Sequence, residues 1–185
     1  QMVRQVLQVN KTVHVLVNNA GGPPPGPSGK LAAADWQRAF ELTLMSAVNV
    51  TTAVLPAMRE QKWGRIVNIS SHSIKQPIAD LMLSNSLRLA VAGWAKTLAN
   101  EVAADNVLVN TVAPGWTRTD RVSQMLASRA QATGRTVAEI ETGLQAAVPL
   151  GRKPCRSPTS TRCPRRTDPR SWPVAVPFLS NRGTH

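Results

Sequence analysis

The sequence predicts an α/β fold in which helices cover both faces of a parallel sheet. Three short apolar, β-branched segments alternate with two long segments whose apolar residues recur every three or four positions. Strands joined through helices make right-handed crossovers, so they run parallel. Hydrophobic residues make up 42% of the 185 residues, which is enough for a packed core and excludes wholesale disorder.

The first half of this pattern begins with a strand over residues 12–17, TVHVLV, which ends in a loop rich in glycine and proline. A helix of about seven turns follows over residues 36–61. Asp35 stands just before it and is the expected N-cap, because its carboxylate can accept from the unpaired amides of the first turn. Pro56 is expected to bend or loosen the last turns.

The second half repeats the alternation. A strand over residues 64–71 precedes a helix over 84–103, and residues 106–115 form a third strand. Ligands of parallel sheets bind beyond the carboxyl ends of the strands. The three loops at those ends are therefore expected to meet and form the site; they cover residues 18–22, 68–72 and 114–119.

The net charge of +12 is concentrated in the last 35 residues. Residues 1–150 carry 14 Lys and Arg against 9 Asp and Glu, whereas residues 151–185 carry 8 against 1. We expect a main domain over 1–152 and a basic, irregular tail over 153–185. The composition of the tail is consistent with a segment read out of frame or through a missed splice. A genuine tail that binds nucleic acid is the alternative, and the absence of interleaved aromatic residues makes that reading the weaker one.

Several classes of protein are disfavoured by the remaining composition. The first residues lack the pattern of a signal peptide, and no uninterrupted apolar run approaches the roughly 20 residues of a membrane span. Cys155 and Cys163 have neither zinc-ligand spacing nor a disulfide framework. We expect a soluble, cytoplasmic protein without a metal site or a membrane partner.

Four motifs in order resemble the short-chain dehydrogenase/reductase family, and in particular its 3-oxoacyl-carrier-protein reductases. They are LVNNAGG at 16–22, LPAM at 55–58, GRIVNISS at 64–71 and VLVNTVAPGWTRTD at 107–120, and the match covers residues 12–152. The resemblance implies part of a Rossmann-like, doubly wound sheet. The family's glycine-rich phosphate turn is missing, so the first βαβαβ part is expected to be absent and a dinucleotide to bind poorly or not at all.

The same resemblance implies which residues contact a nicotinamide cofactor, NAD or NADP. Glycine allows the close approach of a backbone to the cofactor, and threonine offers both a donor and an acceptor. For the asparagines, bracing of neighbouring strands is the alternative. The implied cofactor contacts are Asn19, Ala20, Gly21, Arg88, Pro114, Gly115, Thr117 and Thr119.

The catalytic positions that the resemblance implies are altered in this chain. The family reduces a carbonyl with a proton from tyrosine, a lysine four residues later, a serine thirteen residues earlier and an asparagine on the preceding helix. The serine is present as Ser71, but the tyrosine is Ser84, the lysine is Arg88 and the asparagine is Thr43; the chain contains no tyrosine. His72 could supply a proton, although we expect it in a solvated loop.

Two functions follow from the resemblance. The first is an NAD(P)-dependent oxidoreductase of small carbonyl or alcohol substrates, with doubtful activity in this chain. The alternative is a catalytically inactive relative that acts as a scaffold or interaction subunit. In either case the apolar faces of residues 36–58 and 84–104 suggest a homo-oligomer.

Overall fold

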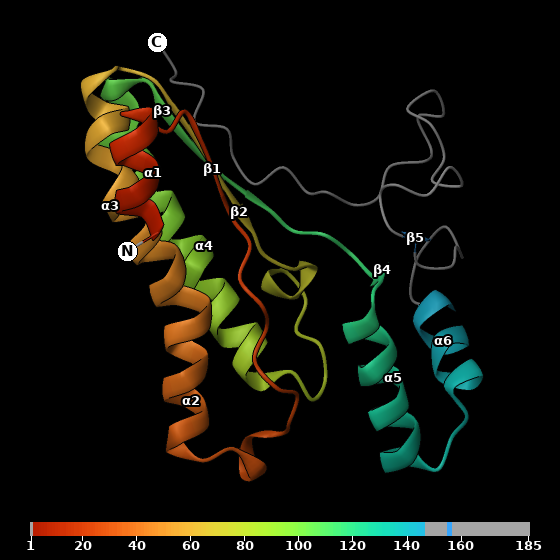
Figure 1. Cartoon of the computed structure of the whole chain (residues 1–185). Helices are drawn as coiled ribbons and strands as arrows, with labels where there is room; N and C mark the ends of the chain where they lie inside the picture. The colour runs from red at the N-terminus through yellow and green to blue at the C-terminus, as the bar shows by residue number, and fades with distance from the viewer. Residues whose placement is uncertain (1, 147–154, 157–185) are drawn as a thin grey trace, which may run out of the picture. The chain divides into compact units, whose positions relative to one another are not determined.

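The computed structural model describes residues 2–146 and 155–156, which fall into two compact units. In Figure 1 the described part of the first unit runs from α1 to the end of β3, and the second starts at Pro114. Each unit is described by itself. The predicted tail of residues 153–185 lies almost wholly outside the described residues, and the domain boundary at residue 152 stays a prediction.

The first unit contains a three-stranded parallel sheet. Its strands are β1 (Val15–Asn18), β2 (Gly64–Ile69) and β3 (Val107–Val112), in the order β1-β2-β3. Val15 pairs with Arg65, and Gly64 pairs with Val107. Consecutive strands are thus neighbours joined through helices, and the predicted parallel α/β architecture is confirmed.

Helical segments connect these strands, and the described part of the second unit contains two helices and two very short strands. The helical segments of the first unit are α1 (Met2–Asn10), η1 (Ser28–Lys30), α2 (Ala33–Phe40), η2 (Glu41–Met45), α3 (Ser46–Glu60), η3 (His72–Ile74), α4 (Met82–Val102) and η4 (Ala103–Asp105). The second unit contains β4 (Thr117–Arg118), α5 (Asp120–Thr133), α6 (Val137–Ala146) and β5 (Cys155–Arg156), with β4 and β5 paired.

The segments α2, η2 and α3 follow one another without a break, and the start of this long helix differs from the prediction. Asp35 is the third residue of α2, not its N-cap; its Oδ2 accepts from the amide of Ala32 at 2.9 Å. This bond, followed by one from Arg38, holds the pKa of Asp35 below its ordinary value. Pro56 lies inside α3, which continues to Glu60.

The core lies between one face of the sheet and the helices α3 and α4. Side chains alternate along β2, so Ile66 is fully buried while its neighbours are half-buried. Ile66 packs with Met58 of α3 and Val102 of α4. The sheet and α3 approach so closely at Gly64 that a Cβ there would lie 2.7 Å from Met58 Sδ. Glycine at this position therefore sets the spacing of the two layers.

The opposite face of the sheet is more open. Val15 and Val17 of β1 point to that face and are 54% and 55% exposed. Within the described part of this unit the helices pack on the other face, where α1 contacts α3. A parallel sheet flanked by helices is thus confirmed, and the predicted second layer of helices stays a prediction.

One described helical stretch, residues 33–60, is long and apolar enough to cross a membrane by length and composition alone. A core helix of a soluble protein meets the same criteria. This stretch supplies Val54 and Met58 to the core.

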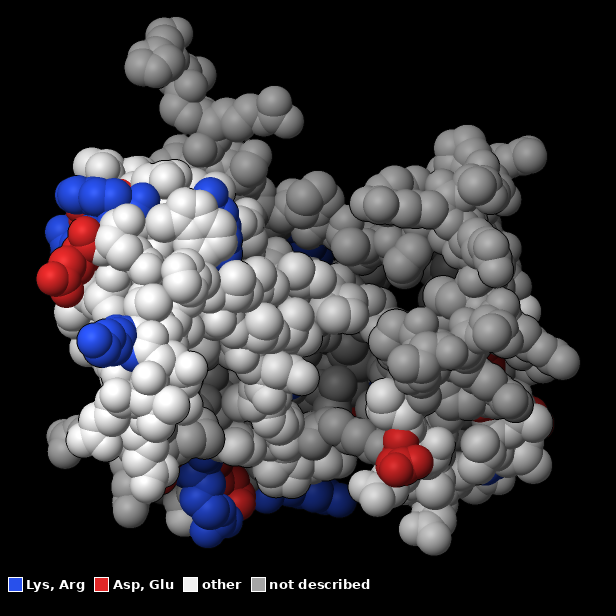
Figure 2. All heavy atoms as spheres, turned by 45° about the horizontal axis from the view of Figure 1, so that its top comes forward, with Lys and Arg blue, Asp and Glu red and all other residues white. Residues whose placement is uncertain are grey.

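Charged side chains are scattered over the described surface. On the face shown in Figure 2, Lys and Arg form separate groups and leave most of the described surface uncharged. Among the described residues, Arg59 and Lys62 both form ion pairs with Asp105. The described part of this face thus shows no continuous basic patch of the kind that nucleic acids bind.

Candidate active site

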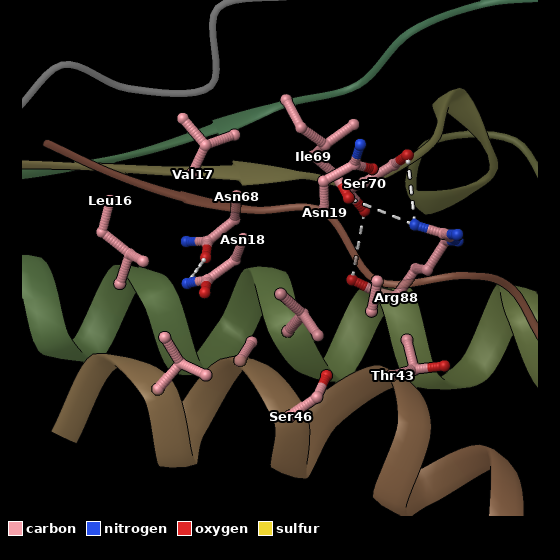
Figure 3. A pocket seen from close by; sticks show the side chains of 14 residues that line it. Leu16, Val17, Asn18, Asn19, Thr43, Ser46, Asn68, Ile69, Ser70 and Arg88 are labelled. Atoms are coloured by element: carbon pink, nitrogen blue, oxygen red, sulfur yellow. Dashed lines mark hydrogen bonds between the residues drawn. The ribbon is translucent and has the colours of Figure 1, made fainter. Parts of the chain in front are cut away.

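A cavity of about 280 Å³ lies at the carboxyl ends of β1 and β2, between the sheet and the helices α3 and α4. Figure 3 shows polar side chains from the strand ends along its upper side and helix residues along its lower side. The strand ends contribute Asn18, Asn19, Asn68 and Ser70, and the helices contribute Thr43, Ser46, Ala47, Val50, Arg88 and Val91. This is the edge of the sheet at which the sequence predicts the site.

At one end of the cavity two asparagines connect the strands. Asn18 Nδ2 donates to Asn68 Oδ1 at 2.9 Å and to Thr51 Oγ1 of α3 at 3.0 Å. Asn18 therefore braces β1 against β2 and α3, as the alternative reading of these asparagines proposes. Asn19, one residue further on, is exposed and lines the cavity.

Arg88 lies toward the other end of the cavity, and its side chain is directed at the carboxyl end of β2. Its Nη1 donates to the carbonyl oxygens of Ile69 at 3.2 Å and Ser70 at 3.3 Å. Ser70 Oγ returns a long bond of 3.5 Å to the carbonyl oxygen of Arg88. These contacts tie α4 to the carboxyl end of β2 through the side chain that replaces the family's lysine.

Ser84 lies one helical turn before Arg88 and is 8% exposed. Arg88 Nε donates to Ser84 Oγ at 3.2 Å, as expected for residues four apart on a helix. The two altered catalytic positions are therefore in contact. The serine is much shorter than a tyrosine, and the described cavity is lined by Arg88 but not by Ser84.

Ser71 has a local structural role in addition to its predicted catalytic one. It is the N-cap of η3, and its Oγ accepts from the amide of Ser73 at 3.2 Å. The adjacent Ser70 lines the cavity, whereas Ser71 does not. His72 follows in η3 and is half-buried, so it is only partly exposed in the loop where a solvated position is predicted.

Thr43 lies on the five-residue π-helix η2 and is 5% exposed. Among the described residues its Oγ1 has no hydrogen-bond partner, and neither has Nδ2 of Asn68, which is 1% exposed. A buried polar group left unpaired costs about 1–3 kcal/mol. Such groups in native proteins commonly bind a ligand or a water molecule.

The predicted cofactor residues divide between the two units. Asn19 and Ala20 line the cavity, and a Cβ added to the neighbouring Gly21 would meet no atom within 4 Å. The other contacts implied by the resemblance, Pro114, Gly115, Thr117 and Thr119, belong to the second unit. There Thr119 caps α5, with its Oγ1 accepting from the amide of Val122 at 3.4 Å. The predicted meeting of this third loop with the other two stays a prediction.

The predicted site loop over residues 68–72 includes Asn68 and Ser70 without singling them out, and the sequence prediction missed Ser46. Asn68 carried a usable signal, because it occupies a position of β2 whose alternation requires a buried side chain. A polar residue at such a position indicates a buried hydrogen-bonding site. Nothing in the local sequence distinguishes Ser70 from Ser71.

The resemblance assigns Asn19, Ala20 and Gly21 to the adenosine–ribose side of a nicotinamide dinucleotide. The exposed side chain of Asn19 and the open backbone at Gly21 are compatible with such a contact. No described residue forms a glycine-rich phosphate turn. Within the described ranges, no three His, Cys, Asp or Glu side chains are grouped as metal ligands.

The family model for short chain dehydrogenases matches residues 1–130. The chain belongs to the short-chain dehydrogenase family. This agrees with the motifs at residues 16–22, 64–71 and 107–120.

Relatives of this chain include proteins named as reductases. It is 39% identical over 110 residues to the acetoacetyl-CoA reductase of Cupriavidus necator, covering 60% of this chain and 45% of the relative. It is 34% identical over 125 residues to a 3-oxoacyl-[acyl-carrier-protein] reductase of Synechocystis, covering 68% and 51%. The chain thus spans about half the length of the curated relatives it matches.

Solved structures show the same fold. An actinorhodin polyketide ketoreductase with NADPH superposes with a TM-score of 0.76 at 34% identity, over 83% of this chain and 59% of the other. An NAD⁺-bound xylitol dehydrogenase has the same TM-score and coverages of 83% and 62% at 22% identity, which is a likeness of fold alone. These likenesses extend over most of this chain and over about three fifths of each solved structure.

Proposed function

We propose that this protein is an NAD(P)-dependent oxidoreductase of small carbonyl or alcohol substrates in which the proton-transfer step is impaired. Family membership and the reductases among its relatives support the reaction class. The observation that carries the proposal is the cavity at the carboxyl ends of β1 and β2, lined by Asn19, Ala20 and Arg88. These are residues that the resemblance assigns to the cofactor.

In such a reaction the bound nicotinamide supplies or accepts the hydride. The chain itself has to orient the substrate, hold the ribose and move a proton. The hydroxyl of Ser71 can donate to a substrate carbonyl, because its known bond in η3 uses only an oxygen lone pair. Arg88 remains a cation at any relevant pH and can hold ribose hydroxyls. To contact a ribose, Arg88 would have to give up its hydrogen bonds to the carbonyl oxygens of Ile69 and Ser70.

The proton donor is the weak part of this site. A phenol with a pKa of about 10 can be made more acidic by a neighbouring cation. Ser84 has an aliphatic hydroxyl, which is a far weaker acid, and it lies buried beneath Arg88. Reduction at this site is therefore expected to be slow, with substrate binding less affected than turnover.

The test is an assay of the longest form of the protein that its gene encodes. Acetoacetyl-CoA serves as the carbonyl substrate, with NADH and NADPH in parallel, and cofactor binding is followed by nicotinamide fluorescence. The proposal requires cofactor binding together with slow oxidation of NADH or NADPH that depends on the substrate. Absence of both binding and turnover would refute it.

A non-catalytic scaffold is the second candidate, and one observation favours it. Arg88 is bonded to Ser84 and to the end of β2, so the replaced pair acts as a tie between helix and strand. A protein that binds the cofactor but gives no turnover at any enzyme concentration supports this second function.

A homo-oligomer is part of the proposal. Large apolar side chains are exposed on the long helices: Trp36 is 36%, Phe40 37% and Leu89 56% exposed. Trp36 and Phe40 lie one turn apart and share a face. Association of two copies through these helices would cover them. Light scattering should give a mass above 19.9 kDa, and a monomeric mass would refute this part.

A further inference from the structure

The three-stranded sheet has a second face, on the side away from α3 and α4. Side chains alternate along a strand, and Ile66, Val107 and Val109 belong to the core, so their neighbours point to the opposite face. Figure 3 shows Val17 and Ile69 directed away from the helices. Parallel sheets occur almost only with both faces covered. This second face is therefore expected to have a covering segment.

The strand register arranges the side chains of this face in rows that cross the sheet. We call these eight residues the open face: Val15, Arg65 and Leu108; Val17, Val67 and Asn110; Ile69 and Val112. All except Arg65 and Asn110 are apolar, and Val15, Val17 and Leu108 are 54%, 55% and 39% exposed. A contiguous apolar surface of this kind indicates an interaction site.

Arg65 is the one charged residue of the open face. Its guanidinium carbon lies 4.4 Å from the centre of the Trp63 ring, and its Nη1 donates to the carbonyl oxygens of Gly64 and Asn106. The open face contains no carboxylate that would attract a basic segment. Its composition therefore selects an apolar occupant rather than a cationic one.

The last 35 residues contain one run with this composition. Residues 172–179, WPVAVPFL, are apolar residues and two prolines, and they lie outside the described residues. Residues 157–171 are instead rich in arginine, proline, serine and threonine. Packing of the run on the open face would remove large apolar side chains of both partners from water.

The length of the chain allows this contact. The fifteen residues between Arg156 and Trp172 span up to about 50 Å when they are extended. A unit of the size of residues 1–113 has a radius of gyration of only about 13 Å. A tethered segment also has an effective concentration of about millimolar, which favours it over a partner in free solution.

We propose that residues 172–179 pack across the open face through their side chains and cover it. Pro173 and Pro177 lack the amide that a strand ladder needs, so the run does not join the sheet as a central strand. Apolar contacts hold it in place, and salt should therefore have little effect. The open face is distinct from the cavity between the sheet and the helices, so the proposal does not depend on the reaction.

A photo-cross-linker placed in the full chain tests the proposal. Phe178→benzoylphenylalanine keeps an aromatic side chain that inserts into neighbouring C–H bonds on illumination, and Ser160→benzoylphenylalanine is the control in the basic segment. Mass spectrometry should find cross-links within one chain to open-face residues of β1, β2 or β3. Their yield should be several-fold above that of the control and similar at about 0.1 M and 1 M salt.

Two leucine variants localise the contact. Leu108→Ser on the open face should lower the cross-link yield several-fold, whereas Leu89→Ser on α4 should not; these leucines are 39% and 56% exposed. Circular dichroism checks their folding, and the cross-linked positions in the otherwise unchanged chain decide the proposal even if Leu108→Ser unfolds. Cross-links between two chains, cross-links to α3 or α4, or a yield equal to that of the Ser160 control would overturn it.

Discussion

The two halves of helix α4 differ in what they do. In the second half, Ala95, Leu98 and Val102 are buried in the core beneath the sheet. In the first half, Ser84 and Arg88 face the carboxyl end of β2 and form polar contacts. Leu83 and Leu87 of the first half are also buried, so core packing there involves side chains other than those at the positions that carry the family's chemistry. Catalytic residues could change here while the helix kept its place.

The largest effect is expected in the core half. Ile66→Ala removes a fully buried side chain that packs against both α3 and α4, and it should lower the free energy of unfolding by about 2–5 kcal/mol. Leu89→Ala on the exposed side of α4, at 56% exposure, should change it by less than about 0.5 kcal/mol. Urea unfolding followed by circular dichroism measures both. Similar losses for the two variants would mean that the core is not where the contacts place it.

A smaller effect is expected at the polar half. Arg88→Met keeps the aliphatic stem but leaves the carbonyls of Ile69 and Ser70 without these donors, which should cost about 1–3 kcal/mol. Lys96→Met, an exposed position two turns further along α4, is the matched control and should cost less than about 0.5 kcal/mol. If both variants unfold at the same urea concentration, Arg88 does not tie the helix to β2.

The smallest effect concerns an ion-pair cluster remote from the cavity and depends on pH. Asp105 accepts from Lys62 Nζ at 2.5 Å and from Arg59 Nε at 2.6 Å. The bond from Lys62, followed by that from Arg59, lowers the pKa of Asp105 below its ordinary value of 3.8. Because the folded-state pKa is the lower one, the stabilisation is present above that ordinary value and is lost as the pH falls through the folded-state pKa.

Asp105→Asn therefore serves as the comparison for this cluster. The wild type and this variant should differ in the urea concentration at which half of the protein is unfolded. This difference should be largest at pH 7 and should become smaller as the pH falls below about 4. A gap of equal size at pH 7 and pH 3 would show that the charge of Asp105 contributes nothing.

The fold could be predicted from the sequence to different degrees in its different parts. The three strands are β-branched runs bounded by turn residues, and they appear close to the predicted residues. The sequence predicts Asp35 as the N-cap, three residues after the N-cap that the structure has, because a carboxylate also stabilises a helix from inside its first turn. The π-helix at Glu41–Met45 cannot be recognised from apolar residues that recur every three or four positions.

The place of the site at the carboxyl ends of the strands follows from the predicted parallel topology, whereas contacts between its side chains could be predicted only within a single element. The contact of Ser84 with Arg88 follows from their separation of four residues on a helix. The turn of Arg88 toward the carbonyls of β2 depends on how α4 crosses the sheet, which no local pattern contains. The same holds for the unpaired atoms of Thr43 and Asn68, since they come from elements that are brought together by packing.

The most direct test of the impaired proton donor is the double variant Ser84→Tyr with Arg88→Lys, in the longest form of the protein that its gene encodes. Reduction of acetoacetyl-CoA by NADPH or NADH should rise by about 10²–10⁴-fold in kcat, the usual contribution of a general acid. Ser84→Phe with Arg88→Lys adds the ring without the hydroxyl and should give no rise. A wild-type rate equal to that of the tyrosine variant would contradict the account, because another group, such as Ser71 or His72, would then supply the proton.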